Sequence, residues 1–167
     1  MIDFALFFVA LAVIGLDQYT KHWVRQNLAP GTSYNPVSWL EPIVTLTYVH
    51  NTGAAFGLFP GMQYVFAGVA LVVAVLVVIY HRQLTGDSLF LHLAFGLQLG
   101  GALGNLIDRV FRGRVTDFID FRVWPVFNVA DSSVVVGTIL LVYYSFFLSK
   151  AFEREDKPLD SEIARGP

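Results

Sequence analysis

Four long apolar stretches constrain this chain more than any other feature. They fall at residues 4–24, 64–80, 88–107 and 129–148 of the 167. A helix needs roughly 20 mostly apolar residues to cross the hydrocarbon core of a bilayer, and each stretch is close to that length. Only 14% of the residues are charged, whereas an ordinary soluble domain carries about 25%. The sequence therefore predicts an all-α integral membrane protein with four transmembrane helices in a single domain, residues 1–150.

The connections between the stretches are unequal in length. Residues 81–87 form a short polar turn between the second and third stretches, whereas the first and third connections are much longer. With four spans, the two longer connections lie on the same side of the membrane. Residues 43–49 are rich in β-branched residues and partly alternate, as a half-buried strand does. We expect a small β-sheet or loop element at the membrane surface over residues 33–58, and a separate polar tail, residues 151–167.

Several classes of protein and site are disfavoured by composition. The chain has no cysteine, which excludes disulfides, a thiol nucleophile and thiolate metal sites. Its net charge of −2 offers no basic patch for nucleic acid. The four histidines show no metal-ligand spacing, and there is no HExxH or GxSxG motif. The start Met1-Ile2-Asp3 lacks the positive charge of a cleavable signal peptide. We therefore expect a retained first span, no metal and no cofactor.

The third stretch carries Gly96, Gly100 and Gly104, four residues apart. Such a stripe of small residues lets helices approach closely in lipid, so its predicted role is helix packing. Orientation is left open by charge, because lysines and arginines occur on both sides of the predicted spans.

Polar and ionisable side chains gather near the ends of the spans, on the side of the long connections. Groups at membrane depth are costly and need a reason. Asp17 and Lys21 are four residues apart on one helix face and can form a structural ion pair. Asn105, Asp108 and Arg109 also share a face, where structural or substrate-positioning work is expected. The full set is Asp17, Lys21, Asn51, Asn105, Asp108, Arg109, Asp117, Asp120, Asn128 and Asp131.

Two carboxylates close together are a catalytic device. They do not readily ionise together, so one can act as a base towards water while the other, still protonated, polarises a carbonyl. Asn128 and Asp131 begin the fourth span, where they would equally suit a helix cap, and the preceding connection can fold Asp117 back against Asp131. The residues alone leave the pair open among Asp108, Asp117, Asp120 and Asp131, although Asp120 is expected to be a solvated loop charge.

Five blocks of sequence, in order along the chain, resemble the lipoprotein signal peptidase (signal peptidase II) family. The match runs over nearly the whole chain. The blocks are Asp17-Gln18-Tyr19-Thr20-Lys21, Asn51-Thr52-Gly53-Ala54-Ala55-Phe56-Gly57, Gly100-Gly101-Ala102-Leu103-Gly104-Asn105-Leu106-Ile107-Asp108-Arg109, Val115-Thr116-Asp117-Phe118, and Phe127-Asn128-Val129-Ala130-Asp131-Ser132.

The resemblance implies a cofactor-independent aspartyl endopeptidase of the bacterial cytoplasmic (inner) membrane, with both termini cytoplasmic and the active site on the extracytoplasmic side. It implies cleavage of diacylglyceryl-modified prolipoproteins just before the lipidated cysteine, and sensitivity to globomycin. The family's catalytic dyad falls on Asp117 and Asp131. Its other functional residues fall, for substrate binding, on Asn51, Gly53, Asn105, Arg109 and Asn128, and, as supporting polar residues, on Asp17, Lys21 and Asp108. The expected partners are lipidated prolipoproteins and membrane phospholipid, with the protein itself monomeric.

Two alternatives from other classes make different predictions. A small polytopic transporter or channel would place polar groups near the bilayer midplane and often contain an internal repeat; neither feature is evident in the sequence. A non-catalytic membrane scaffold would explain the glycine stripe but would leave the clustered acids without a role.

Overall fold

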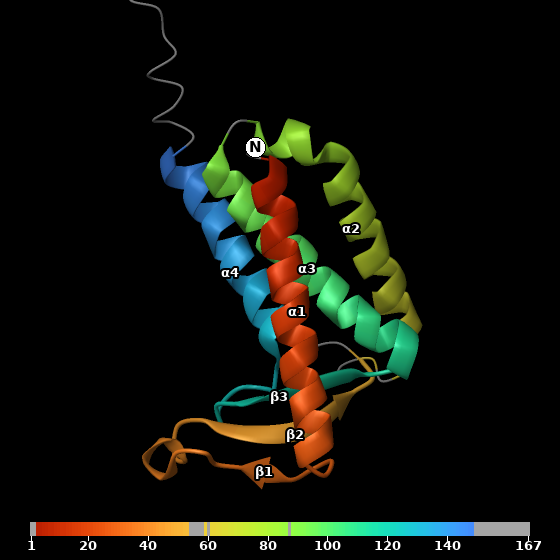
Figure 1. Cartoon of the computed structure of the whole chain (residues 1–167), viewed down its shortest axis with the longest axis vertical. Coiled ribbons are helices and arrows are strands. Elements are labelled where there is room, and N and C mark those ends of the chain that lie inside the picture. Colours follow the sequence, from red (N-terminus) through yellow and green to blue (C-terminus); the bar gives the residue numbers. More distant parts are fainter. Residues whose placement is uncertain (1–2, 54–58, 60, 87, 149–167) are drawn as a thin grey trace, which may run out of the picture.

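The computed structural model describes residues 3–53, 59, 61–86 and 88–148. Four long helices dominate this part of the chain: α1 (Asp3–Asn27), α2 (Gln63–Thr85), α3 (Leu89–Arg112) and α4 (Val129–Tyr143), the last continued by a π-helical turn, η3 (Tyr144–Leu148) (Figure 1). Each is long and apolar enough to cross a membrane. The predicted multi-pass membrane fold is confirmed.

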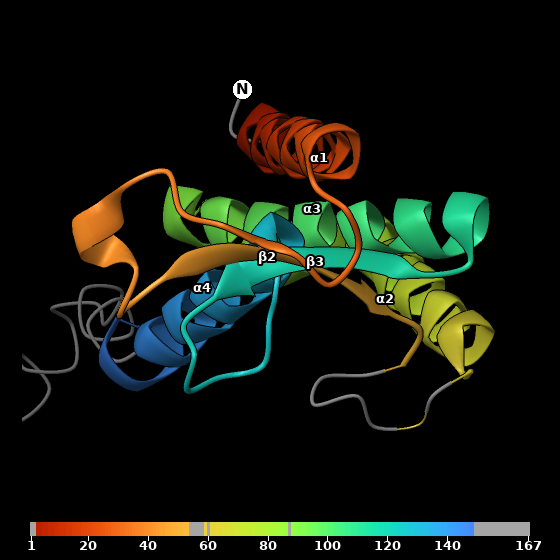
Figure 2. The same ribbon diagram turned by 90° about the horizontal axis from the view of Figure 1, so that it is seen from below.

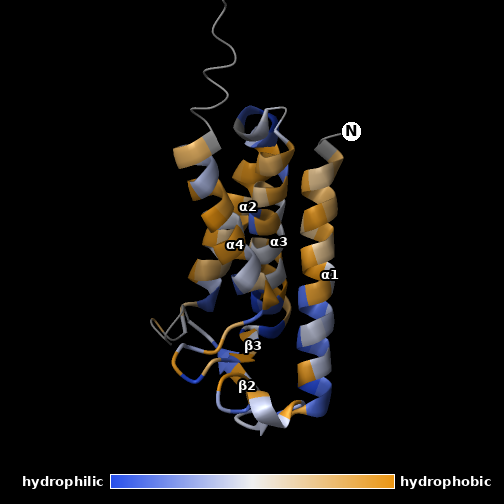
Figure 3. Cartoon of the chain, turned by 90° about the vertical axis from the view of Figure 1, so that its left-hand side faces the viewer, coloured by the Kyte–Doolittle hydropathy of each residue, from blue (hydrophilic) through white to orange (hydrophobic). Residues whose placement is uncertain are grey.

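Helix α3 is the centre of the bundle and packs against α1, α2 and α4 (Figure 2). A small core of Leu6, Ala10, Ala74, Val77 and Leu99 joins α1, α2 and α3. Large apolar side chains also cover the outside of the helices, and Figure 3 shows these apolar surfaces along their length. Because lipid tails solvate apolar side chains, such an exterior is typical of a bundle within a bilayer.

The glycine stripe of α3 lies against α1, in the packing role predicted for it. A Cβ atom at Gly96 would be 2.7 Å from the carbonyl oxygen of Leu6, and one at Gly100 would be 2.7 Å from the Cβ of Val13. At Gly104 the Cβ would lie 2.7 Å from Oδ2 of Asp17. The close approach of α1 and α3 therefore requires residues without a side chain at Gly96 and Gly100. Gly104 also makes room for the carboxylate of Asp17.

A three-stranded antiparallel sheet lies across one end of the bundle (Figures 1 and 2). Its order is β1 (Ser33–Tyr34), β2 (Thr45–Asn51), β3 (Val115–Asp120). The third strand comes from the connection between α3 and α4, whereas the sequence predicted a sheet from the first connection alone. The segment 115–120 is short and its residues do not alternate in burial, so its periodicity does not predict a strand. It becomes a strand by pairing with the edge of β2. Parts of the expected β element (residues 54–58) and the tail (151–167) lie outside the described residues.

Helix α3 extends five residues beyond the end expected from its apolar run. It ends where Gly113 adopts a left-handed conformation (φ 68°) and donates its N–H to the carbonyl oxygen of Arg109, a common way to terminate a helix. The apolar run reflects the thickness of the hydrocarbon core rather than the length of the helix. Asp108 and Arg109 therefore lie on a regular helix that continues past the apolar part.

Candidate active site

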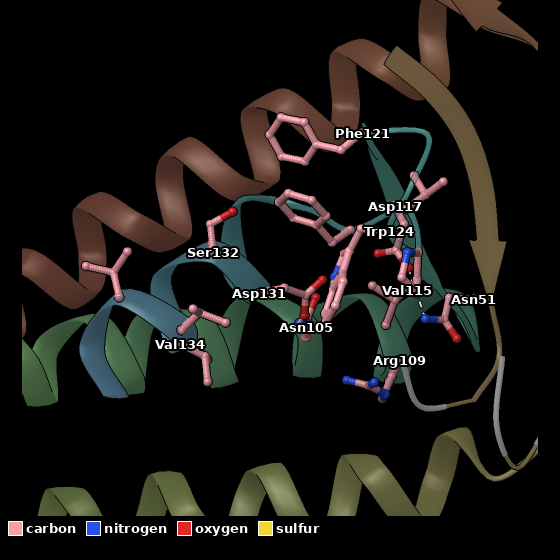
Figure 4. A pocket seen from close by; sticks show the side chains of 15 residues that line it. Asn51, Asn105, Arg109, Val115, Asp117, Phe121, Trp124, Asp131, Ser132 and Val134 are labelled. Carbon is pink, nitrogen blue, oxygen red and sulfur yellow. Dashed lines mark hydrogen bonds between the residues drawn. The ribbon is translucent and has the colours of Figure 1, made fainter. Parts of the chain in front are cut away.

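Asp117 and Asp131 line one cavity of about 670 Å³ at the sheet end of the bundle (Figure 4). Asp117 lies on β3 and is buried, and Asp131 lies in the first turn of α4. The chain folds back between them, because Ile119 and Phe127 exchange backbone hydrogen bonds (Ile119 N to Phe127 O, 2.7 Å; Phe127 N to Ile119 O, 3.1 Å). The connection between α3 and α4 thus returns Asp117 towards the start of α4, as the sequence suggested it could.

Asn128 connects the two acids. Its side-chain Nδ2 donates to Oδ1 of Asp117 (2.6 Å), and its backbone N–H donates to Oδ2 of Asp131 (3.2 Å). In return its Oδ1 accepts the backbone N–H of Asp131 (2.9 Å), so that the two residues form a reciprocal capping box at the start of α4. The predicted helix cap is therefore present, and the same cap that starts α4 fixes the position of a carboxylate that lines the cavity.

The surroundings of Asp117 raise the pKa of its carboxyl to about 6. Burial is the largest cause, because it disfavours the charged form, and the negative charge of Asp131 acts in the same direction. The amides of Asn51 and Asn128 oppose the rise by donating hydrogen bonds to the carboxylate, the first over 2.9 Å to Oδ2. Such a carboxyl exchanges its proton near neutral pH, as a general acid or base must.

Behind Asp117 and Asp131 lies a fully buried charged group, Lys21. Its Nζ is 2.9 Å from Oδ2 of Asp17 and 3.5 Å from Oδ2 of Asp108, and it donates to Oδ1 of Asn105 (2.9 Å). An ammonium has no acceptor atom, so Asn105 must turn its oxygen towards Lys21 and its Nδ2 towards the cavity. That Nδ2 donates to Oδ1 of Asp131 (2.7 Å). Lys21 thereby fixes which group Asn105 presents to Asp131.

The two buried acids beside Lys21 hold the elements that carry Asp117 and Asp131. Asp17 accepts the backbone N–H of Ala130 (3.0 Å), which ties α1 to the start of α4. Asp108 accepts the backbone N–H of Thr116 (2.9 Å) and lies 3.4 Å from the guanidinium of Arg25. Arg25 was not singled out from the sequence, although it continues the four-residue spacing of Asp17 and Lys21 along α1.

The remaining predicted residues are divided between the cavity and its edge. Arg109 lines the cavity, with its guanidinium 5.9 Å from the ring centre of Phe66. The backbone N–H of Gly53 donates to Oδ1 of Asn51 (2.9 Å) and so orients the Asn51 amide towards Asp117. Asp120, the spare acid, is not among the described residues that line the cavity.

The cavity also has an apolar wall that sequence reasoning missed. It is formed by Phe121, Trp124 and Phe127 of the loop between β3 and α4, together with Val134 and Val135 of α4. Figure 4 labels Phe121, Trp124 and Val134 among these lining side chains. The density of large apolar residues just before the fourth span is the signal that could have revealed it. The site thus combines a polar end, where two acids can activate water against an amide, with an apolar trough beside a membrane helix.

Comparison with known proteins supports a common ancestry along most of the chain. A family model described as Signal peptidase (SPase) II matches residues 9–147. The lipoprotein signal peptidase of Moorella thermoacetica is 47% identical over 135 residues, covering 81% of this chain and 88% of the relative. That of Clostridioides difficile is 44% identical over 146 residues, covering 86% of this chain and 96% of the relative.

Solved structures agree with this relationship. A bacterial membrane enzyme determined by the in meso method at 2.3 Å resolution superposes with a TM-score of 0.80 at 30% identity, covering 92% of this chain and 93% of that chain. A second, at 1.9 Å resolution, gives a TM-score of 0.76 at 32% identity, with 85% and 92% covered. The residues matched by the family model, 9–147, run from within α1 to beyond the end of α4 and include both long connections.

Proposed function

This chain belongs to the signal peptidase II family, a family of membrane peptidases, and we propose that Asp117 and Asp131 are its catalytic dyad. The substrate proposed is a prolipoprotein already modified with diacylglycerol, cleaved just before the lipidated cysteine, without a cofactor. The observation that carries the proposal is the shared hydrogen-bond network of the two acids, which meet through Asn128 in one cavity.

Peptide hydrolysis is helped by a base for the attacking water and an acid for the oxygen of the reacting carbonyl. With one proton on the dyad, the ionised carboxylate takes a proton from water as the water attacks the scissile carbonyl carbon. The protonated carboxyl donates to the carbonyl oxygen, and a proton then passes to the departing amine as the C–N bond breaks. Asn105 and Asn128 hold the carboxylates in position, and Arg109 supplies a positive charge at the cavity.

The place of the cavity supports a lipid-anchored substrate. Asp131 lies just inside the end of α4, where the apolar span begins. A peptide bond next to a lipidated cysteine is held close to the bilayer surface by the acyl chains, and therefore meets the dyad at that depth. The apolar trough beside α4 offers contacts to the lipid or to apolar side chains. We place this end of the bundle on the extracytoplasmic side of the inner membrane, with cytoplasmic termini.

The test uses the purified protein with a lipidated prolipoprotein and with the unlipidated precursor. Asp117→Asn and Asp131→Asn should each lower kcat at least about 100-fold, since each removes a proton-transfer group. Glu41→Gln, an exposed acid in the extramembrane element, is the matched control and should cleave normally. Wild-type activity in either dyad variant would remove that residue from the mechanism, and equal cleavage of the unlipidated precursor would overturn the substrate.

Membership of a peptidase family argues against the transporter and scaffold alternatives. The described polar groups of the network also gather at one end of the bundle rather than along a path across it. Binding of globomycin at the cavity of the wild-type protein is a further expectation of the proposal.

A further inference from the structure

One part of the apolar wall of the cavity is a closed loop, residues 121–127. Its neck is fixed by the backbone bonds between Ile119 and Phe127. The rings of Phe121 and Phe127 stack at that neck, with centroids 5.6 Å apart. Because the neck is fixed, the turn within the loop decides where Phe121 and Trp124 face the cavity.

That turn has an unfavourable backbone conformation. Arg122 has a positive φ of 65°, although it is not glycine. The N–H of Val123 donates to the carbonyl oxygen of Phe121 (2.7 Å), which makes Arg122 the centre of a γ-turn. The γ-turn with positive φ is the rare and strained form, and such a conformation persists where surrounding groups hold it.

Asp120 is the group that holds this turn. Its Oδ1 accepts the backbone N–H of Arg122 (2.8 Å), and its Oδ2 accepts the hydroxyl of Thr47 on β2 (2.8 Å). Thr47 has one hydroxyl hydrogen, which is directed to Asp120. The hydroxyls of Ser33 (2.9 Å) and Thr45 (3.1 Å) therefore donate to Thr47, which links the anchor to β1 and to the rest of β2.

We propose that Asp120 is a positioning residue for substrate binding, which acts by holding the turn at Arg122 and thereby the wall of the cavity. This rests on the proposed peptidase function. Asp120 has no part in the chemistry, because the dyad receives its hydrogen bonds from Asn51, Asn105 and Asn128. Its loss should weaken binding of the apolar part of the substrate and leave the chemical step unchanged.

The first experiment separates the hydrogen bonds of Asp120 from its charge. Asp120→Asn keeps an oxygen for the Arg122 N–H and an amide that can donate to Thr47, so its KM for the lipidated substrate should stay near wild type. Asp120→Ala loses both bonds. Its KM should rise about tenfold, while kcat should stay within about twofold of wild type. A tenfold rise in KM corresponds to about 1.4 kcal/mol, which is within the range of the strain stored in such a turn. An Asn variant as impaired as the Ala variant, or a fall in kcat with a shifted pH profile, would show that Asp120 acts by charge on the dyad and would overturn the proposal.

The second experiment tests the turn itself. Glycine adopts positive φ without strain, so Arg122→Gly should lower the KM of the Asp120→Ala variant back towards wild type. A KM unchanged by this second substitution would show that the turn is not the route of the effect. Should Asp120→Ala fail to fold, Thr47→Val removes one anchoring donor and should raise KM by a smaller factor; an unchanged KM there also counts against the proposal.

A readout that does not need activity keeps the proposal distinct from the peptidase function. Hydrogen–deuterium exchange of the peptide covering residues 120–127, in detergent micelles, should be faster in Asp120→Ala than in wild type and in Asp120→Asn. If the wild type cleaves no lipidated substrate, the proposed function fails while this exchange result still tests the turn. If cleavage is normal and exchange is equal in all three proteins, the role of Asp120 fails alone.

Discussion

Removal of the Asn51 amide should move the pH dependence of cleavage in a direction fixed by the geometry. Asn51 donates to Oδ2 of Asp117 over 2.9 Å, and a donor favours the ionised form of a carboxyl. Without it, the pKa of Asp117, about 6 in the intact site, must rise. Asn51→Ala is therefore expected to retain the dyad proton to higher pH.

The size of this shift follows from the energy of one hydrogen bond to a charged group, about 1.5–3 kcal/mol. Since one pKa unit corresponds to about 1.36 kcal/mol, complete loss would raise the pKa by about one to two units. Water can enter the open cavity and replace part of the lost bond, so we expect about one unit. The proton on the dyad is needed for the acid role, so the alkaline limb of kcat/KM should move from about pH 6 to about pH 7.

The assay is the pH profile of kcat/KM with a lipidated peptide, which reports the free enzyme. A change in substrate affinity alters the height of this profile, whereas the pKa alters its midpoint. Asn27→Ala, an exposed asparagine at the end of α1 whose amide bonds the carbonyl of Trp23, is the matched control and should leave the midpoint in place. An alkaline limb that stays fixed in Asn51→Ala, or moves to lower pH, would refute the reasoning.

Three further predictions concern stability, measured by thermal unfolding of the purified protein in detergent. Lys21→Met should lower the free energy of unfolding by about 3–5 kcal/mol, because it leaves the buried Asp17 without its ammonium partner. Adding Asp17→Asn should recover part of this loss. A Lys21→Met protein as stable as wild type would contradict the ion-pair argument. Gly104→Ala should cost about 1–3 kcal/mol, since its Cβ would lie 2.7 Å from Oδ2 of Asp17, whereas Gly15→Ala, within α1 and with open space around it, should raise stability by up to about 1 kcal/mol; equal effects would count against close packing. The pKa of Asp117 is raised from 3.8 to about 6, so between these pH values the folded state holds a proton that the unfolded state loses. The free energy of unfolding should therefore fall by up to about 3 kcal/mol as pH rises from about 4 to 6. An Asp117→Asn protein with the same pH dependence would show that another group is responsible.

Much of the network could be anticipated from spacing along single helices. Asp17 and Lys21 share a face because they are four residues apart, and the structure joins them over 2.9 Å. Asn128 and Asp131 suit the start of a helix, and they form the predicted kind of cap. These interactions are local, so the period of the helix is enough to bring the side chains together.

Contacts between distant segments could not be anticipated in this way. The pairing of β3 with β2 joins residues more than sixty positions apart, as with Asn51 and Val115, and no periodic pattern marks the short third strand. The turn at Arg122 also gives no sequence signal, since arginine is not a residue that favours positive φ. Asp120 was expected to be a solvated charge. In the structure it accepts hydrogen bonds from Thr47 and from the backbone of Arg122, and the bond to Thr47 depends on the distant strand β2.

The sequence by itself determined that this chain spans a membrane four times, because the length and apolar character of a span depend on local composition and on the thickness of the bilayer. It also determined that costly polar groups collect near one end of the spans. Which acids meet was decided by tertiary structure. Asp108 is held by Thr116 and Arg25, Asp120 turns towards β2, and Asp117 reaches Asp131 through Asn128. The physical reason is that a carboxylate takes its role from the charges and donors around it, and these come from segments that lie far apart in the chain.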